Sequence, residues 1–232
     1  MKYLLPLVLF LLISAGYTYA QENLNQFDEK GRKQGEWQKM DQQGRMVYKG
    51  SFNHDKPQGL FIYFDSTGKV KARVEYSSNG NEAYTTSYYP NGRKMSEGLY
   101  LNEKREGEWK FYNLDTLLIS EEYYENGQPT GKWKNYYQNG ALLEEITYKN
   151  GIKDGPWKQY YFDGPVKLSA KYINGKLEGL ATFYHPNGRV MISGPYKNHH
   201  KDGVWMYLDN KGIAEKKEVW AGRIPYGRRI LQ

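Results

Sequence analysis

The sequence predicts an all-β fold, an elongated single-layer antiparallel meander of about eight β-hairpin repeats, each 24 residues long. Three observations predict this fold: residues that recur every 24 positions, turn signals between them, and short intervals rich in strand-forming residues. Residues that recur without insertion or deletion fill equivalent places in a stacked unit. The periodicity therefore determines the fold class more firmly than any sum of propensities.

The repeat is marked first by glycine. Steps of 24 from Gly35 to Gly227 meet glycine at every position except Ala83. Two positions after the glycine, one column holds five of the six tryptophans, and a column 17 positions after it is aromatic in all eight units. We interpret the glycines and the tryptophans as structural, because stacking alone predicts one ring in each unit. The structural tryptophans are Trp37, Trp109, Trp133, Trp157 and Trp205.

Turn signals divide each unit into two strands. From Gly127 to Gly188, Asn-Gly and Asp-Gly pairs are spaced alternately by 13 and 11 residues. Both residues of such a pair tolerate the positive φ of tight hairpin turns. Each interval is rich in Tyr, Trp, Phe, Val and Ile and is too short for a capped helix. Each unit is therefore expected to be one hairpin, which gives about sixteen strands in all.

Alternation along the strands predicts two different faces. In the first strand of a unit, Trp133 faces one side, while Lys134 and Tyr136 face the other. In the second strand, Leu142 and Ile146 are expected to share a face, and the intervening positions of such strands are mostly charged. A single layer has no conventional core, so rings stacked along the ribbon are expected to stabilise it.

The third unit departs from the pattern at two positions. Ala83 stands in the glycine column and Thr85 stands in the tryptophan column. We therefore expect this hairpin to be the weakest, and the ribbon to bend or fray at this point.

The chain is expected to have four parts: a signal peptide at 1–20, a lead-in at 21–34, eight repeats at 35–226 and a basic tail at 227–232. The first part has an early lysine, an apolar run, and a small residue, Ala20, before the expected cleavage site. Its apolar run is too short for a comfortable membrane span. Retention as an uncleaved anchor is the alternative.

The chain contains no cysteine. This excludes a lipid-modified cysteine, disulfide bonds and thiolate metal sites. Export without disulfides indicates a bacterial envelope more than a eukaryotic secretory route. The expected location is therefore the periplasm, the cell surface or the exterior.

The formal net charge of the full chain is +7. The basic residues are spread through turns and strands, which favours an ordinary solvated surface. The basic balance also allows anionic partners, such as phosphorylated glycans, lipid head groups or acidic proteins. Nucleic acid is not expected as the partner of an exported chain.

The sequence offers no constellation typical of catalysis. Its four histidines lie in or beside predicted turns, and the adjacent pair His199 and His200 would point to opposite faces of a strand. Nucleophile-elbow, phosphate-loop, dinucleotide and metal-hydrolase motifs do not occur. We therefore expect no catalytic residue, no metal site, no cofactor and no enzymatic activity.

The repeat also carries a resemblance to a known family. The frame G-x-W-x-x-Y-x-x-N-G is followed by an apolar, Glu/Lys-rich strand that ends in Y-x-N-G-x-x-x-G. This pattern resembles the MORN repeat, in its bacterial variant form, over about residues 27–227. In the fifth unit the match is carried by Gly131, Trp133, Tyr136, Asn139, Gly140, Tyr148, Asn150, Gly151 and Gly155.

The resemblance implies an elongated antiparallel sheet that serves as an interaction platform, in some members for membrane lipids or scaffold assembly. Bacterial proteins built from the variant repeat resemble the YwqK-family antitoxin group, which implies that such a chain neutralises a toxin by binding it. With an export signal, that toxin would have to be exported or at the cell surface.

The leading hypothesis is a non-catalytic exported scaffold of the cell envelope that binds a protein partner, with antitoxin-like toxin binding as one form of it. The alternative is a module that binds a glycan or an anionic lipid through an aromatic stripe, and the third hypothesis is a purely structural spacer. The candidate stripe, for which a structural ladder is the favoured interpretation, consists of Tyr112, Tyr136, Tyr160 and Tyr184.

Overall fold

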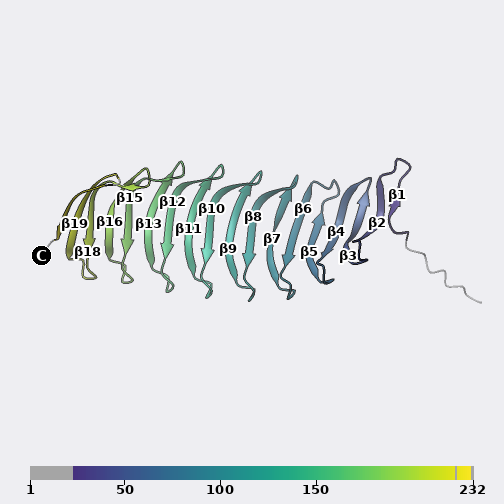
Figure 1. The fold of residues 1–232 in the computed structure, drawn as a ribbon, viewed down its shortest axis with the longest axis horizontal. Coiled ribbons are helices and arrows are strands. Elements are labelled where there is room, and N and C mark those ends of the chain that lie inside the picture. The colour runs from purple at the N-terminus through teal and green to yellow at the C-terminus, as the bar shows by residue number, and fades with distance from the viewer. Residues whose placement is uncertain (1–22, 223, 231–232) are drawn as a thin grey trace, which may run out of the picture.

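The computed structural model describes residues 23–222 and 224–230, and the expected signal peptide lies outside this part of the chain. The described residues form 20 strands and no helix. Figure 1 shows the strands side by side across the long axis of a single layer, with β1 and β19 near opposite ends of the row. The predicted all-β antiparallel meander is confirmed.

The strands follow each other along the chain without a crossover, because each one pairs antiparallel with its sequence neighbours. Their bounds are β1 Gln26–Phe27, β2 Lys33–Met40, β3 Met46–Asn53, β4 Lys56–Phe64, β5 Val70–Tyr76, β6 Glu82–Tyr88, β7 Lys94–Leu101, β8 Lys104–Tyr112, β9 Leu118–Glu125, β10 Gln128–Tyr136, β11 Leu142–Lys149, β12 Ile152–Tyr160, β13 Val166–Ile173, β14 Lys176–Leu177, β15 Gly179–Tyr184, β16 Val190–Lys197, β17 His200–Lys201, β18 Gly203–Leu208, β19 Ala214–Ala221 and β20 Ile224–Ile230.

The eight hairpins correspond to β2 through β19. In this stretch β14 and β15 both pair with β13, so these two short strands are one interrupted strand. In the same way β17 and β18 both pair with β16 and form one interrupted strand. The ends add two strands to the repeats. β1 lies in the lead-in and pairs with β2, while β20 pairs with β19. Residues 227–230 therefore lie in a strand, where the sequence analysis expected a tail beyond the sheet.

The Asn-Gly signals form the hairpin turns because both residues adopt positive φ. Between β9 and β10, Asn126 has φ 51° and Gly127 has φ 82°, which is the backbone of the two-residue turn that matches the twist of paired strands. At the other edge of the sheet the turns are longer. There the amide of Gly140 donates to the carbonyl of Tyr137 at 2.9 Å.

The first glycine column has a separate structural role. Gly131 has φ 64°, and the pairing of β9 with β10 shifts its register between Thr130 and Lys134. A β-bulge of this kind needs a residue that accepts positive φ, and glycine does so without steric cost. β5 and β6, where Ala83 replaces the glycine, pair without a register shift.

The tryptophan column forms a row of partly to fully buried side chains on one side of the sheet, which we call the tryptophan face. Trp205 is 0% exposed, and Trp109 and Phe61, which fill the same column, are 2% exposed. Trp133 lies between Tyr124 and Tyr148, with ring centroids 5.3 and 4.6 Å away. The rings pack edge-on or tilted, an arrangement that aromatic side chains prefer to face-to-face stacking.

A close cross-strand contact makes this burial possible in a single layer. Gly98 lies opposite Trp109 in the pairing of β7 with β8, and a Cβ at Gly98 would lie 2.3 Å from the indole ring. The guanidinium of Arg105 covers the same ring, 4.7 Å from its centroid. The backbone below and a cation above together exclude water from the ring.

One expectation about local structure was wrong. Leu142 lies opposite Tyr136, after a register shift that follows Asn135, so it joins the tyrosine side of the sheet and not the face of Ile146. At the third unit the strands are paired, and the expectation that this hairpin is the weakest stays a prediction. β5 and β6 keep unbroken register from Ala72 to Tyr76, because without the positive-φ glycine no bulge interrupts the strand.

Candidate binding surface

The four candidate tyrosines end the first strands of four consecutive units and lie on the side of the sheet opposite the tryptophans, which we call the tyrosine face. Each of them is partly buried. Because they recur every 24 residues in strands that share one sheet, they form a row along the ribbon. The row consists of Tyr112, Tyr136, Tyr160 and Tyr184.

Three of these phenols make the same contact with a glutamate of the preceding strand, which pairs directly with the strand of the tyrosine. Tyr136 donates its hydroxyl hydrogen to the carboxylate of Glu121 at 2.8 Å, and Tyr160 donates to Glu145 at 3.0 Å. Tyr112 makes the corresponding hydrogen bond to Glu97 at 2.5 Å. We call each such tyrosine and glutamate pair a rung.

Lysines complete the rungs. The ammonium of Lys134 lies 3.1 Å from the Glu121 carboxylate, and that of Lys94 lies 2.8 Å from Glu97. Burial opposes ionisation of Glu97, but the hydrogen bonds from Lys94 and Tyr112 outweigh it and lower the pKa of Glu97. Glu97 therefore accepts hydrogen bonds from a lysine and from a phenol.

The same hydrogen bonds raise the pKa values of the tyrosines. Burial and the hydrogen bond to Glu145 raise the pKa of Tyr160 to about 12. Burial and the hydrogen bond to Glu121 likewise raise the pKa of Tyr136. A neutral phenol is favoured because its hydrogen bond would become a repulsion between two anions if the proton left.

Tyr184 differs from the other three members of the row. Ser169 occupies the position that is equivalent to Glu145 in the unit before it. The structure therefore brings Tyr112, Tyr136 and Tyr160 into one repeated arrangement, whereas Tyr184 shares their column and face without the glutamate of a rung.

A second column of contacts, six positions after the first glycine, was not predicted from the sequence. Tyr137 donates its hydroxyl hydrogen to the carbonyl of Tyr160 at 2.8 Å, and Tyr161 donates to the carbonyl of Tyr184 at 2.6 Å. Each contact ties a turn to the next unit. The signal was a tyrosine pair at the end of the first strand in three of the eight units, but Asp, Asn and His occupy this column in the other five.

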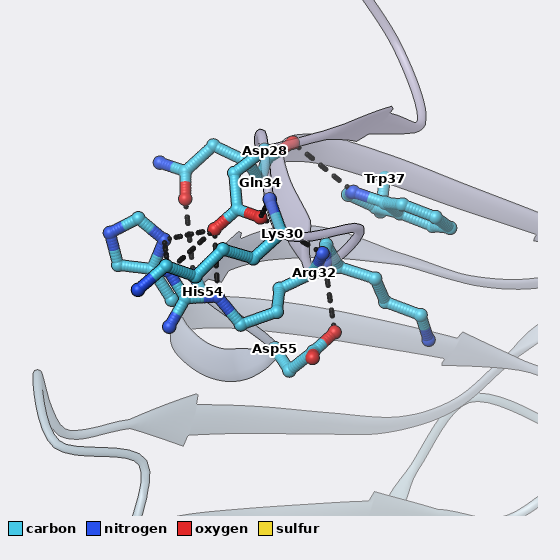
Figure 2. Close-up of polar contacts among 8 residues, drawn as sticks. Asp28, Lys30, Arg32, Gln34, Trp37, His54 and Asp55 are labelled. Carbon is cyan, nitrogen blue, oxygen red and sulfur yellow. Dashed lines mark hydrogen bonds and ion pairs between the residues drawn. The ribbon is translucent and has the colours of Figure 1, made fainter.

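The N-terminal edge holds a separate polar cluster (Figure 2). The carboxylate of Asp28 lies 2.7 Å from the guanidinium of Arg32 and 2.6 Å from the ring of His54. Backbone and side-chain hydrogen bonds from Arg32 hold the pKa of Asp28 well below its usual range. The cluster ties the lead-in to the turn between β3 and β4, which gives it a structural role at this edge.

Among residues 23–222 and 224–230, no group of three or more His, Cys, Asp or Glu residues could hold a metal ion. Within the same residues, no helix is long and apolar enough to cross a membrane.

Comparison with known proteins supports the repeat and its phase. A family model described as MORN repeat variant matches residues 57–78, 129–150 and 177–198. The starts of these matches differ by 72 and 48 residues, both multiples of 24. A search of the curated proteins found no match.

Solved structures show only distant likeness. A mutant of S. aureus TarM in complex with fondaparinux, alpha-GlcNAc-glycerol and UDP is 21% identical, covers 41% of this chain and 19% of its own, and has a TM-score of 0.32. The TcdB2-TccC3-TEV structure is 14% identical over 83% of this chain and 13% of its own, with a TM-score of 0.24. The chain thus spans about a fifth or less of the length of either solved protein. The chain contains MORN variant repeats at three positions, within a single sheet of hairpins that continues the same period on both sides of them.

Proposed function

We propose that this protein is a non-catalytic scaffold that binds a protein partner along its tyrosine face. The observation that carries the proposal is the set of three rungs, which repeat one arrangement of phenol and carboxylate at a fixed interval. A regular row of this kind suits an extended surface on another protein, as is usual for repeat proteins.

The physical chemistry of the rungs supports protein binding. Tyrosine is enriched at protein interfaces, because it offers a large rigid contact area at low entropic cost. Here the phenols of Tyr112 and Tyr136 are already fixed by hydrogen bonds to Glu97 and Glu121. A partner would therefore meet side chains whose conformations are set before binding, which lowers the cost of association.

The location and the finer function of the scaffold are part of the proposal. Residues 1–20 have the composition of a signal peptide, which supports action in the cell envelope or outside it. The resemblance to the antitoxin group supports an exported or surface toxin as the partner. N-terminal sequencing of the protein from its own envelope would test export, since a mature chain should begin after Ala20.

Crosslinking from defined positions tests the binding face. A photocrosslinking amino acid would replace Lys132, whose side chain is 57% exposed and reaches Glu145 on the tyrosine face. The matched control places it at Lys39, an exposed position on the tryptophan face. We expect one protein to be recovered from the Lys132 position and not from Lys39.

A second experiment tests whether binding of the recovered protein depends on the rungs. With the purified partner, Tyr136→Ser and Tyr160→Ser together should weaken binding at least tenfold, while circular dichroism shows an intact sheet. Equal recovery from both faces, or binding unchanged by the two substitutions, would contradict the proposal. Retention by envelope lipids or glycans alone, with no crosslinked protein, would favour the lipid or glycan alternative.

A further inference from the structure

The tryptophan face has a gap in its row of rings at the third unit. In regular units one ring of the tryptophan column lies between two rings of the column 17 positions after the glycine. Phe61 lies between Phe52 and Tyr76, with both centroid distances 5.1 Å. In the third unit the two flanking rings are Tyr76 and Tyr100, and Thr85 stands where the central ring would be.

The missing ring leaves a cavity of about 720 Å³. Its apolar lining includes Ala72, Val74 and Ala83, and the rings of Tyr63, Tyr76 and Tyr100 also line it. Polar residues of two adjoining turns contribute as well, namely Asn81, Asn102 and Glu103. The cavity thus combines aromatic and apolar walls with hydrogen-bond acceptors at one side.

The chain keeps this cavity open by two further substitutions. Asn81 occupies the position equivalent to Arg105, whose guanidinium covers Trp109, but its side chain is shorter and carries no cation. Ala83 replaces the bulge glycine, so β5 and β6 pair in regular register below the gap. Nothing from the repeat itself therefore takes the place of the ring.

The space below the gap accepts an indole elsewhere in the same sheet. Val74 lies opposite Thr85, just as Ile146 lies opposite Trp157 in the sixth unit. A branched aliphatic side chain beneath the ring is therefore compatible with tryptophan at this place in the repeat. Regular indoles also donate their N–H to protein acceptors, as Trp109 does to the carbonyl of Leu99 at 3.0 Å.

We propose that this cavity is a binding site for a tryptophan side chain carried by a segment of a partner protein. The indole would complete the row of rings between Tyr76 and Tyr100, and its N–H and the neighbouring peptide groups would meet the acceptors of Asn81, Asn102 and Glu103. Only the source of the ring rests on the proposed protein-binding function. The cavity itself lies on the opposite face from the rungs.

Titration with a small probe tests the site directly. N-acetyl-tryptophanamide carries the ring together with peptide N–H groups, and N-acetyl-leucinamide is the matched aliphatic probe. We expect the tryptophan probe to shift the methyl NMR signals of Val74 in a saturable way, and the leucine probe to bind at least tenfold more weakly. Free indole should also bind more weakly than the tryptophan probe, because it lacks the peptide donors.

Substitutions that fill the cavity with a side chain of this protein provide the matched variants. Thr85→Trp places the indole of the regular repeat in the cavity and should weaken binding of the tryptophan probe at least tenfold. Thr86→Trp adds the same side chain one residue later, on the tyrosine face opposite Arg73, and should leave binding unchanged. Thr85→Phe has the precedent of Phe61 and answers the same question if Thr85→Trp does not fold.

Three results would overturn the proposal. They are the absence of a saturable shift at Val74, undiminished binding by folded Thr85→Trp or Thr85→Phe, and indole binding as tight as that of the tryptophan probe. The last result would assign the cavity to a small aromatic molecule and not to a protein segment. Because the probe needs no partner protein, failure here would leave the crosslinking test of the tyrosine face unaffected.

Discussion

At the scale of single residues, Thr116 shows how closely the repeat depends on backbone conformation. It is the one departure from the second glycine column, yet it keeps the glycine conformation, with φ 66°. Its amide donates to the carbonyl of Asn113 at 3.0 Å, as the amide of Gly140 does to Tyr137 at 2.9 Å. The turn therefore imposes its geometry on a β-branched residue, for which this region is strained.

Thr116→Gly should consequently stabilise the protein. Left-handed backbone costs an ordinary residue roughly 1–2 kcal/mol, and glycine offsets part of this gain through its greater freedom in the unfolded chain. We expect a net increase of about 0.5–1 kcal/mol in the free energy of unfolding, measured by urea denaturation. The control is the reverse change, Gly140→Thr, which should destabilise. A loss of stability in Thr116→Gly would show that the hydroxyl or methyl group outweighs the strain.

Tyr160 provides a prediction about alkaline pH. Its pKa in the folded protein is raised to about 12 by burial and by the hydrogen bond to Glu145, whereas an unfolded tyrosine titrates near ~10. Below pH ~10 both states are protonated, so the contribution of Tyr160 to stability is fully present. It is lost as the pH rises from ~10 toward 12, because the unfolded chain then gains stability by releasing the proton.

NMR of the Tyr160 ring would follow this titration. Glu145→Gln removes the carboxylate but leaves the burial, so we expect the pKa of Tyr160 to fall while staying above that of an unfolded tyrosine. An unchanged pKa in Glu145→Gln would show that burial alone is responsible. Titration of the wild-type residue near pH 10 would contradict the rung itself.

At the scale of elements, the hairpins are joined by more than the ladder of backbone hydrogen bonds. Tyr137 and Tyr161 each reach from a turn of one unit to the carbonyl of a strand end in the next, at 2.8 and 2.6 Å. His185 makes a similar contact with the carbonyl of Leu208 at 3.0 Å. These side chains fix the spacing of successive turns along one edge of the sheet.

Tyr161→Phe removes one such contact and keeps the ring. We expect it to lower the free energy of unfolding by about 0.5–1.5 kcal/mol, the usual net value of one hydrogen bond. Tyr137→Phe is the matched change at the preceding junction, and urea denaturation of both single variants and the double variant measures additivity. No loss in either variant would show that water replaces the phenol without cost.

The hairpins could be predicted from the sequence because their turns need particular residues. Positive φ at Asn126 and Gly127 leaves few alternatives to Asn-Gly, so the pattern fixes each turn. The position of Leu142 could not be predicted, because the register shift inserts a residue in a strand without a special residue to mark it. Alternation alone then assigns Leu142, which precedes the shift, to the face of Ile146, which follows it.

The candidate surface was predictable in part for a similar reason. The tyrosine row follows from periodicity, since equivalent positions share a column. The rungs depend on which glutamate lies within reach of each phenol, and that requires the register between the tyrosine strand and the strand before it. The cavity at the third unit was visible in the sequence only as Ala83 and Thr85. Its size could not be predicted, because it depends on the regular pairing of β5 with β6 beside the gap.

At the scale of the whole molecule, the sheet is a linear array in which each strand contacts only its neighbours along the chain. The stability of such an array is a sum of unit and interface contributions. The row of rings is interrupted at Thr85 and at Ala181, which both stand in the tryptophan column. Ala181 is 1% exposed, whereas Thr85 lines an open cavity together with Tyr76 and Tyr100. The array should therefore be least strongly coupled at the third unit.

Hydrogen exchange measured by mass spectrometry tests this coupling. Amides of β6 should exchange faster than those of β10, whose Trp133 packs between two rings. Thr85→Trp should slow the exchange of β6 and raise stability by roughly 1.5–3 kcal/mol, the value of burying one large side chain. Thr86→Trp, on the other face, should do neither. Equal exchange rates of the β6 and β10 amides in the wild-type protein would mean that the backbone hydrogen bonds couple the units without help from the rings. Filling the cavity would then have no effect on the stability of the rest of the sheet.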